Sequence, residues 1–153
     1  MLLSDSAYII IKKTKQTFNI QGFAMSNEEK LLKMAQQAAA NSYSPYSNFK
    51  VGAAILTSSG NFYAGCNVEN ISYPVGSCAE QSAISAMISS GDKNISTILI
   101  YADSKELITP CGACRQRIAE FSSPKTIVLL ADASGIRKSL TIKELLPLSF
   151  SEF

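Results

Sequence analysis

Residues 78–102 read CAEQSAISAMISSGDKNISTILIYA. The first half, from Cys78 to Ser90, predicts a helix, and Gly91 follows it in the position that favours a helix end. The apolar run from Ile95 to Ala102 then predicts a buried strand. A helix followed directly by a buried strand is typical of a sheet that is covered by helices, so this stretch predicts an α/β fold.

Similar elements flank this stretch on both sides. Downstream, residues 111–121 predict a second short helix after Pro110, and residues 126–131 predict another apolar strand. Upstream, residues 49–57 and 62–68 are rich in β-forming residues, and a turn joins them, which predicts a hairpin. We therefore expect a three-layer α/β/α sandwich with a mixed central sheet of about five strands.

The N-terminal part divides at Ser26. This serine has Glu29 three residues further on, which is the pattern of a capping box, and it predicts a helix that ends near Pro45. We expect residues 26–153 to form one domain. Residues 1–25 are expected to be an extension of unknown role or an upstream start before Met25. The alternative is an arm that pairs with a neighbour, for which residues 7–11 could supply a short strand.

Composition excludes several classes of function. The chain has 153 residues, enough for one domain with a core. Its net charge of +2 argues against binding to nucleic acid, which usually needs a stronger basic bias. It contains no histidine, which excludes a Ser-His or Cys-His nucleophile and any histidine metal ligand.

Membrane and secretory roles are not expected either. No apolar run approaches the length of about 20 residues that a membrane span needs, and the first residues lack the features of a secretory signal. Four cysteines in a domain of this size do not indicate a disulfide scaffold. We expect a cytoplasmic protein whose thiols are free or bound to metal.

The cysteines carry the predicted chemistry. Cys111 and Cys114 form a C-x-x-C at the start of a predicted helix, and Cys78 begins another. Helix N-termini favour thiolates, and three thiolates suit a tetrahedral Zn²⁺ whose fourth position is open to water. Glu80 lies in the same helical turn as Cys78, where it can take a proton from such a water and pass it on. Two other interpretations stay open: a redox pair, and a closed structural zinc site that also uses Cys66.

The motifs extend well beyond the cysteines. They are Tyr43-Ser44-Pro45-Tyr46-Ser47, Phe49-x-Val51-Gly52-Ala53-Ala54, Gly65-Cys66-Asn67-Val68-Glu69-Asn70-x-Ser72-Tyr73-Pro74, Cys78-Ala79-Glu80, Pro110-Cys111-Gly112-Ala113-Cys114-Arg115-Gln116 and Glu144-Leu145-Leu146-Pro147. In this order they resemble the cytidine deaminases, specifically the small homotetrameric type with three zinc-binding cysteines. The resemblance covers residues 26–150. It implies hydrolysis of cytidine and deoxycytidine to uridine and deoxyuridine with release of ammonia, as in pyrimidine salvage.

The resemblance also implies a role for each matching residue. It implies one Zn²⁺ per chain, with Cys78, Cys111 and Cys114 as ligands and Glu80 as the proton shuttle. The substrate-binding residues that it implies are Asn67 and Glu69 for the ribose 3′-hydroxyl, Phe49 and Ala79 for the base, and Phe150, which would reach a neighbouring subunit's site in a homotetramer. The implied partner is a small nucleoside, with no nucleic acid and no membrane.

One position departs from the family. The three-cysteine type usually has arginine directly after Cys-Ala-Glu, where this chain has Gln81. Three thiolates on Zn²⁺ leave a net charge of −1, and the usual arginine offsets it. Our hypothesis is that Arg115, beside Cys114, supplies part of the missing compensation. The rival functions are deamination of another aminopyrimidine such as blasticidin S, editing of RNA or DNA, and a non-catalytic module stabilised by zinc.

Overall fold

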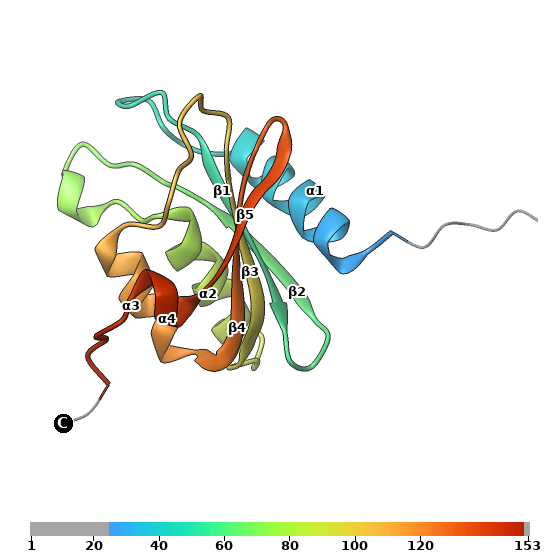
Figure 1. The fold of residues 1–153 in the computed structure, drawn as a ribbon. Helices are drawn as coiled ribbons and strands as arrows, with labels where there is room; N and C mark the ends of the chain where they lie inside the picture. The colour runs from blue at the N-terminus through green and yellow to red at the C-terminus, as the bar shows by residue number, and fades with distance from the viewer. Residues whose placement is uncertain (1–24, 152–153) are drawn as a thin grey trace, which may run out of the picture.

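The computed structural model describes residues 25–151. Its centre is one five-stranded sheet in the order β2-β1-β3-β4-β5, in which β3 and β4 are parallel and the other neighbours are antiparallel. The strands are β1 (Val51–Thr57), β2 (Phe62–Cys66), β3 (Ile95–Ala102), β4 (Ser122–Asp132) and β5 (Gly135–Thr141). Helices lie on both sides of this sheet (Figure 1), so the predicted three-layer α/β/α sandwich is confirmed.

Within residues 25–151, helix α1 (Asn27–Ala40) is the one helix that covers its face of the sheet. It begins with the predicted capping box: Ser26 Oγ accepts from the Glu29 N–H, and Glu29 Oε2 accepts from the Ser26 N–H. Because such a pair satisfies two backbone donors at the helix start, it defines where the helix begins. The helix buries its apolar stripe in a cluster made of Leu31, Ala35, Ala54, Leu99, Leu129 and Ala131.

The opposite face carries α2 (Ala79–Ser89), α3 (Gly112–Glu120) and the short α4 (Ile142–Leu145). Alternate residues of each strand point to this side, so Ile98 and Ile100 of β3 face α2 while Leu99 faces α1. The other members of the larger cluster include Ala53, Ile55, Ala83, Met87, Ile118, Val128 and Leu130. This face matters for function, because α2 and α3 both begin at a cysteine.

Two glycines let the helices approach the sheet closely. A Cβ on Gly52 would lie 1.9 Å from the carbonyl oxygen of Ala35 in α1, and one on Gly65 would lie 2.3 Å from the backbone nitrogen of Ala83 in α2. Real Cβ atoms do not make contacts this short with backbone. The distance from α2 to β2 therefore depends on the absence of a side chain at Gly65.

Most predicted elements are found within a few residues of their expected bounds, and the C-terminal part is where the prediction was incomplete. Residues 135–141 form the edge strand β5, which the sequence pattern does not predict. Four consecutive residues of this strand, Ile136–Ser139, are exposed, so its sequence lacks the alternation that signals a half-buried strand. The strand considered for residues 7–11 and the rest of the extension up to residue 24 lie outside the described residues.

No helix in residues 25–151 is both long and apolar enough to cross a membrane. The longest of them, α1, has 14 residues and a polar outer face.

Candidate active site

Two helix starts bring three cysteines together. Cys78 is the N-cap residue of α2, Cys111 is the N-cap residue of α3, and Cys114 lies in the first turn of α3. Their Sγ atoms all lie within 4.8 Å of one another. This is the only group of three or more potential metal ligands among the residues that the structure describes. The predicted ligand set is thus assembled from two segments that are 33 residues apart.

The donor set fits zinc. Tetrahedral Zn²⁺ with bonds of about 2.3 Å to sulfur holds its sulfurs about 3.8 Å apart, which small side-chain rotations would achieve here. Both helices present unsatisfied N–H groups and the positive end of the helix dipole to the site, so they favour thiolates over thiols. Among the described residues, Cys66 does not belong to this group. Cys66 is the last residue of β2, where it is half-buried and pairs with Gly52 of β1. Three sulfur ligands leave one position of a tetrahedral site open, as a catalytic zinc requires.

The three thiols differ in their surroundings. Burial raises the pKa of the Cys114 thiol far above its usual range, and it also raises that of Cys78. Burial acts on Cys111 in the same direction, but hydrogen bonds from the Cys114 backbone N–H and from the neighbouring thiols outweigh it and lower the pKa of Cys111. Cys111 is exposed while Cys114 is fully buried. Packing therefore holds Cys114 firmly and Cys111 weakly.

Glu80 is a buried carboxylate beside these thiols. It lies in the first turn of α2 with only 4% of its surface exposed. Burial raises its pKa above the usual range, although a hydrogen bond from its own backbone N–H, a hydrogen bond with Cys114 and the charge of Arg117 lower it. A carboxyl group with a raised pKa both takes up and releases protons readily near neutral pH.

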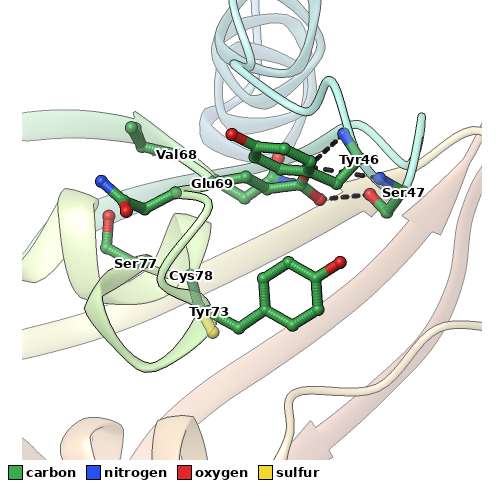
Figure 2. A pocket seen from close by; sticks show the side chains of 10 residues that line it. Tyr46, Ser47, Val68, Glu69, Tyr73, Ser77 and Cys78 are labelled. Atoms are coloured by element: carbon green, nitrogen blue, oxygen red, sulfur yellow. Dashed lines mark hydrogen bonds between the residues drawn. The ribbon is translucent and has the colours of Figure 1, made fainter.

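A pocket of about 440 Å³ opens beside the thiols, and Cys78 forms part of its wall. Figure 2 shows Tyr46, Ser47 and Glu69 on one side of it and Tyr73 and Cys78 on the other. The complete lining is Tyr46, Ser47, Asn67, Val68, Glu69, Asn70, Tyr73, Gly76, Ser77 and Cys78. Of the predicted substrate-binding residues this lining includes Asn67 and Glu69, but not Phe49, Ala79 or Phe150.

Glu69 is held rigidly in this wall. Its Oε2 atom accepts from the backbone N–H groups of Tyr46 (2.9 Å) and Ser47 (3.2 Å), and its Oε1 accepts from the Ser47 hydroxyl. The hydrogen bond from Ser47 is the largest cause that lowers the pKa of Glu69, so the carboxylate stays ionised at neutral pH. A fixed, ionised carboxylate in a pocket is suited to accept hydrogen bonds from the hydroxyl groups of a small ligand.

Asn67 lies next to Glu69 but is bound mainly to its own chain. Its Oδ1 atom accepts from Ser42 Oγ (2.5 Å) and from the Val51 N–H (2.9 Å), and its Nδ2 donates to the Phe49 carbonyl oxygen (2.8 Å). An amide side chain offers four hydrogen-bonding positions, so one N–H remains for a ligand. Asn67 thereby joins the start of β1 to the end of β2 as well as lining the pocket.

The remaining predicted residues lie at the edges of the site. Gln81 is half-buried in the first turn of α2, and Phe49 is 37% exposed just before β1. Phe150 is 65% exposed on the C-terminal tail, where Gln116 of α3 donates to its carbonyl oxygen and accepts from its N–H. Arg115 is bound to Pro110, Thr109 and Leu145.

Sequence reasoning missed three residues that shape the pocket. Ser47 and the Tyr46 backbone fix Glu69, and the rings of Tyr46 and Tyr73 lie with centroids 5.9 Å apart at the pocket. All three stand in quoted motifs but received no role there. In the sequence, Tyr46 and Ser47 belong to one motif and Tyr73 belongs to another. Nothing in these motifs shows that the two segments meet in space.

Comparison with known proteins is consistent with this geometry. A family model described as "Cytidine and deoxycytidylate deaminase zinc-binding region" matches residues 25–130. A protein named cytidine deaminase from Sporosarcina psychrophila is 40% identical over 124 residues, which cover 81% of this chain and 91% of that protein. One named probable cytidine deaminase from Dictyostelium discoideum is 41% identical over 125 residues, 81% of this chain and 84% of that protein.

Solved structures give the same result. The crystal structure of cytidine deaminase from Burkholderia pseudomallei has a TM-score of 0.77 and 38% identity, and the match covers 82% of this chain and all of that one. That of cytidine deaminase from Mycobacterium leprae has a TM-score of 0.68 and 38% identity, over 80% of this chain and 99% of that one. The likeness extends over nearly the whole length of these relatives, so it includes every element that forms the pocket and the thiol group.

Proposed function

The chain belongs to the family of cytidine and deoxycytidylate deaminases with a zinc-binding region, and from this premise we propose that it hydrolyses cytidine and deoxycytidine to uridine and deoxyuridine with release of ammonia. The observation that carries the proposal is the placement of Glu80. A buried carboxylate with a raised pKa lies beside three thiols, and one of these thiols, that of Cys78, lines a pocket of about 440 Å³. A site that only stabilised the fold would give this carboxylate no task.

The enzyme binds one Zn²⁺ per chain, and the residues that would hold it are Cys78, Cys111 and Cys114. When bound, the ion supplies a Lewis acid that activates water as a nucleophile near neutral pH. Because the chain contains no histidine, another side chain must provide the proton transfers, and Glu80 is the buried carboxylate beside the thiols.

Glu80 acts first as a base and then as an acid. It takes a proton from the attacking water and delivers it to N3 of the cytosine ring, which makes C4 more electrophilic. The hydroxide that remains attacks C4 and forms the C4–O bond. Glu80 then takes the second proton from this oxygen and carries it to the exocyclic amino group, so that ammonia leaves as the C4–N bond breaks and the C4 oxygen becomes a carbonyl. Water and cytidine thus give uridine and ammonia, and Glu80 returns to its initial ionisation state.

The predicted substrate-binding residues, two of which line the pocket, orient the nucleoside. We assign Glu69 and the remaining N–H of Asn67 to the ribose 3′-hydroxyl, Phe49 and the Ala79 backbone to the base, and Phe150 to a neighbouring subunit's site. Glu69 is suited to its role because its carboxylate is ionised and held by three hydrogen bonds. A ribose-binding pair favours a nucleoside over blasticidin S, which has no ribose.

The test is the loss of cytidine ultraviolet absorbance, measured together with ammonia release, on purified protein of known zinc content. We expect turnover in the wild type and its loss in Glu80→Gln, which keeps the shape of the side chain but cannot carry the proton. Glu120→Gln, an exposed glutamate near the end of α3, is the matched control and should keep full activity.

Three results would contradict the proposal. Protein without zinc would exclude the metal site, and Glu80→Gln with full activity would exclude the shuttle. Turnover of blasticidin S but not of cytidine would show that the substrate is another aminopyrimidine and not the proposed nucleoside.

We also propose a homotetramer in the cytoplasm. Support for assembly comes from large apolar side chains that are exposed in the described chain around the pocket loop and on the tail, including Ile71 (81%), Tyr73 (75%) and Leu148 (94%). Support for a reducing compartment comes from the four free cysteines, three of which must stay reduced to bind metal. Light scattering in solution tests the assembly.

A further inference from the structure

Arg115 makes three hydrogen bonds, two of which go to the segment before Cys111. Its Nε donates to the Pro110 carbonyl oxygen (2.8 Å), its Nη2 donates to Thr109 Oγ1 (3.2 Å), and its Nη1 donates to the Leu145 carbonyl oxygen (3.0 Å). The first two partners directly precede a zinc ligand in the chain, and the third is the last residue of α4. One guanidinium therefore joins the ligand loop, α3 and α4, and α3 and α4 lie side by side (Figure 1).

The ligand loop needs such an anchor. Residues 103–110, which lead from β3 to Cys111, contain no helix or strand. Cys111 itself is exposed, whereas Cys114 is fully buried and Cys78 is half-buried. Packing fixes the position of Cys114, but hydrogen bonds must fix that of Cys111.

The geometry of the peptide bond explains how Arg115 acts on Cys111. The Pro110 carbonyl group and the Cys111 N and Cα atoms share one planar peptide unit. A hydrogen bond that orients this carbonyl group therefore also orients the N–Cα bond of Cys111 and places the Cα atom that carries the Cys111 side chain. Pro110 cannot rotate about its own φ, so little freedom remains once its carbonyl is bound.

We propose that Arg115 is a positioning residue for the metal site, which holds the Pro110–Cys111 peptide so that the Cys111 thiolate meets those of Cys78 and Cys114. The inference rests on the proposed function and deepens it. In the positioning role, Arg115 strengthens zinc binding through the directions of its hydrogen bonds. In the charge-compensation hypothesis, it does so through its positive charge alone.

Arg115→Lys separates these two roles, because lysine keeps the charge but cannot donate in two directions from a planar fork. The measurements are zinc affinity by competition with a chelator and the absorption spectrum of the Co²⁺-substituted protein, which reports how the thiolates are arranged. We expect Arg115→Lys and Arg115→Gln to lose zinc affinity alike, by about 10- to 100-fold, as is typical when a residue that orients a metal ligand is removed. The Co²⁺ spectrum should change in both.

The matched control is Arg137→Lys, the same exchange at an exposed arginine of β5 that pairs with Asp132. It should keep the zinc affinity and the Co²⁺ spectrum of the wild type. If Arg115→Lys also keeps both while Arg115→Gln loses affinity, charge is sufficient and the positioning role is overturned. If both variants keep wild-type affinity, Arg115 has neither role.

A second variant decides the question if Arg115→Lys fails to fold, as judged by circular dichroism. Thr109→Val removes only the acceptor of the Nη2 bond, at an exposed position. A lower zinc affinity in this variant supports positioning, and an unchanged affinity overturns it. Failure of the proposed function looks different, because the wild type itself would then lack zinc or turnover.

Discussion

Asn67→Asp tests how one side chain serves both the fold and the substrate. The exchange keeps the shape and the Oδ1 acceptor, which binds Ser42 and the Val51 N–H. It replaces the Nδ2 donor by an oxygen, which then faces the Phe49 carbonyl oxygen at the 2.8 Å distance of the present hydrogen bond. Two acceptors at this distance repel each other, so the start of β1 should loosen.

The size of the effect follows from these contacts. One lost hydrogen bond costs about 0.5–1.5 kcal/mol, and an acceptor left without a donor costs about 1–3 kcal/mol more when it is buried. Because solvent reaches this contact, we take the lower part of the range and expect a loss of about 1–3 kcal/mol in the free energy of unfolding at pH 7. Protonation of the new carboxyl group restores a donor, and the repulsion raises the pKa of this group in the folded state above its unfolded value near 4, so the deficit should shrink as the pH falls towards about 4.

The assay is urea unfolding of both proteins at pH 7, combined with kcat and KM for cytidine. Asn70→Asp is the matched control, because Asn70 lines the same pocket and uses its Oδ1 to accept from the Ser72 N–H, a contact that aspartate keeps. Its free energy of unfolding should change by less than about 0.5 kcal/mol. The reasoning is refuted if Asn67→Asp unfolds like the wild type at pH 7 and only its KM rises, since the amide would then serve the substrate alone.

Three further exchanges probe other parts of the structure. Gly65→Ala should cost about 1–3 kcal/mol of stability and weaken zinc binding, because the new Cβ would push α2 away from β2. Gly112→Ala is the comparison, because a Cβ at Gly112 would meet open space. Equal stabilities of the two variants would contradict the argument. Hydrogen bonds from Asn61, then from Ser59 and Tyr63, lower the pKa of Asp92, so its stabilising effect is present above the unfolded pKa near 4 and is lost as the pH falls below that value. The difference in free energy of unfolding between wild type and Asp92→Asn should therefore shrink from pH 6 to pH 3. A difference that grows over this range would exclude the stabilising role of the Asp92 carboxylate. Cys66→Ser should retain one zinc per chain by metal analysis, and its loss would revive the closed four-cysteine site.

The sequence predicts a cluster of Cys78, Cys111 and Cys114, which the structure brings together, because the signals for it are local. Cys78 and Cys111 stand where a helix begins, and the helical pattern that starts at Cys78 and the proline just before Cys111 predict those starts within a residue or two. The spacing of Cys111 and Cys114 places both in one helical turn. That the two helix starts meet follows from the order of elements, since α2 and α3 each lead directly into one of the two parallel strands β3 and β4, so both helices begin at the same end of these strands.

The partners of the polar side chains could not be predicted in the same way, because they are distant in the chain. Ser42 and Asn67 are 25 residues apart, Ser47 and Glu69 are 22 apart, and Arg115 and Leu145 are 30 apart. Each pairing depends on the register between β1 and β2 or on the packing of α4 against β4, and neither leaves a local trace in the sequence. The motifs single out Asn67 and Arg115 but do not show to what these side chains are bound.

This difference changes what a motif residue implies about mechanism. Asn67 matches a position assigned to the ribose, yet three of its four hydrogen-bonding positions are occupied by the protein. A substitution there that lowers activity would therefore not by itself establish contact with substrate, because a displaced β1 would also displace Phe49. Arg115 presents the same problem for the metal, since loss of its charge and loss of its hydrogen bonds both predict weaker zinc binding. Only exchanges that keep one property and remove the other, such as Asn67→Asp and Arg115→Lys, separate the two causes.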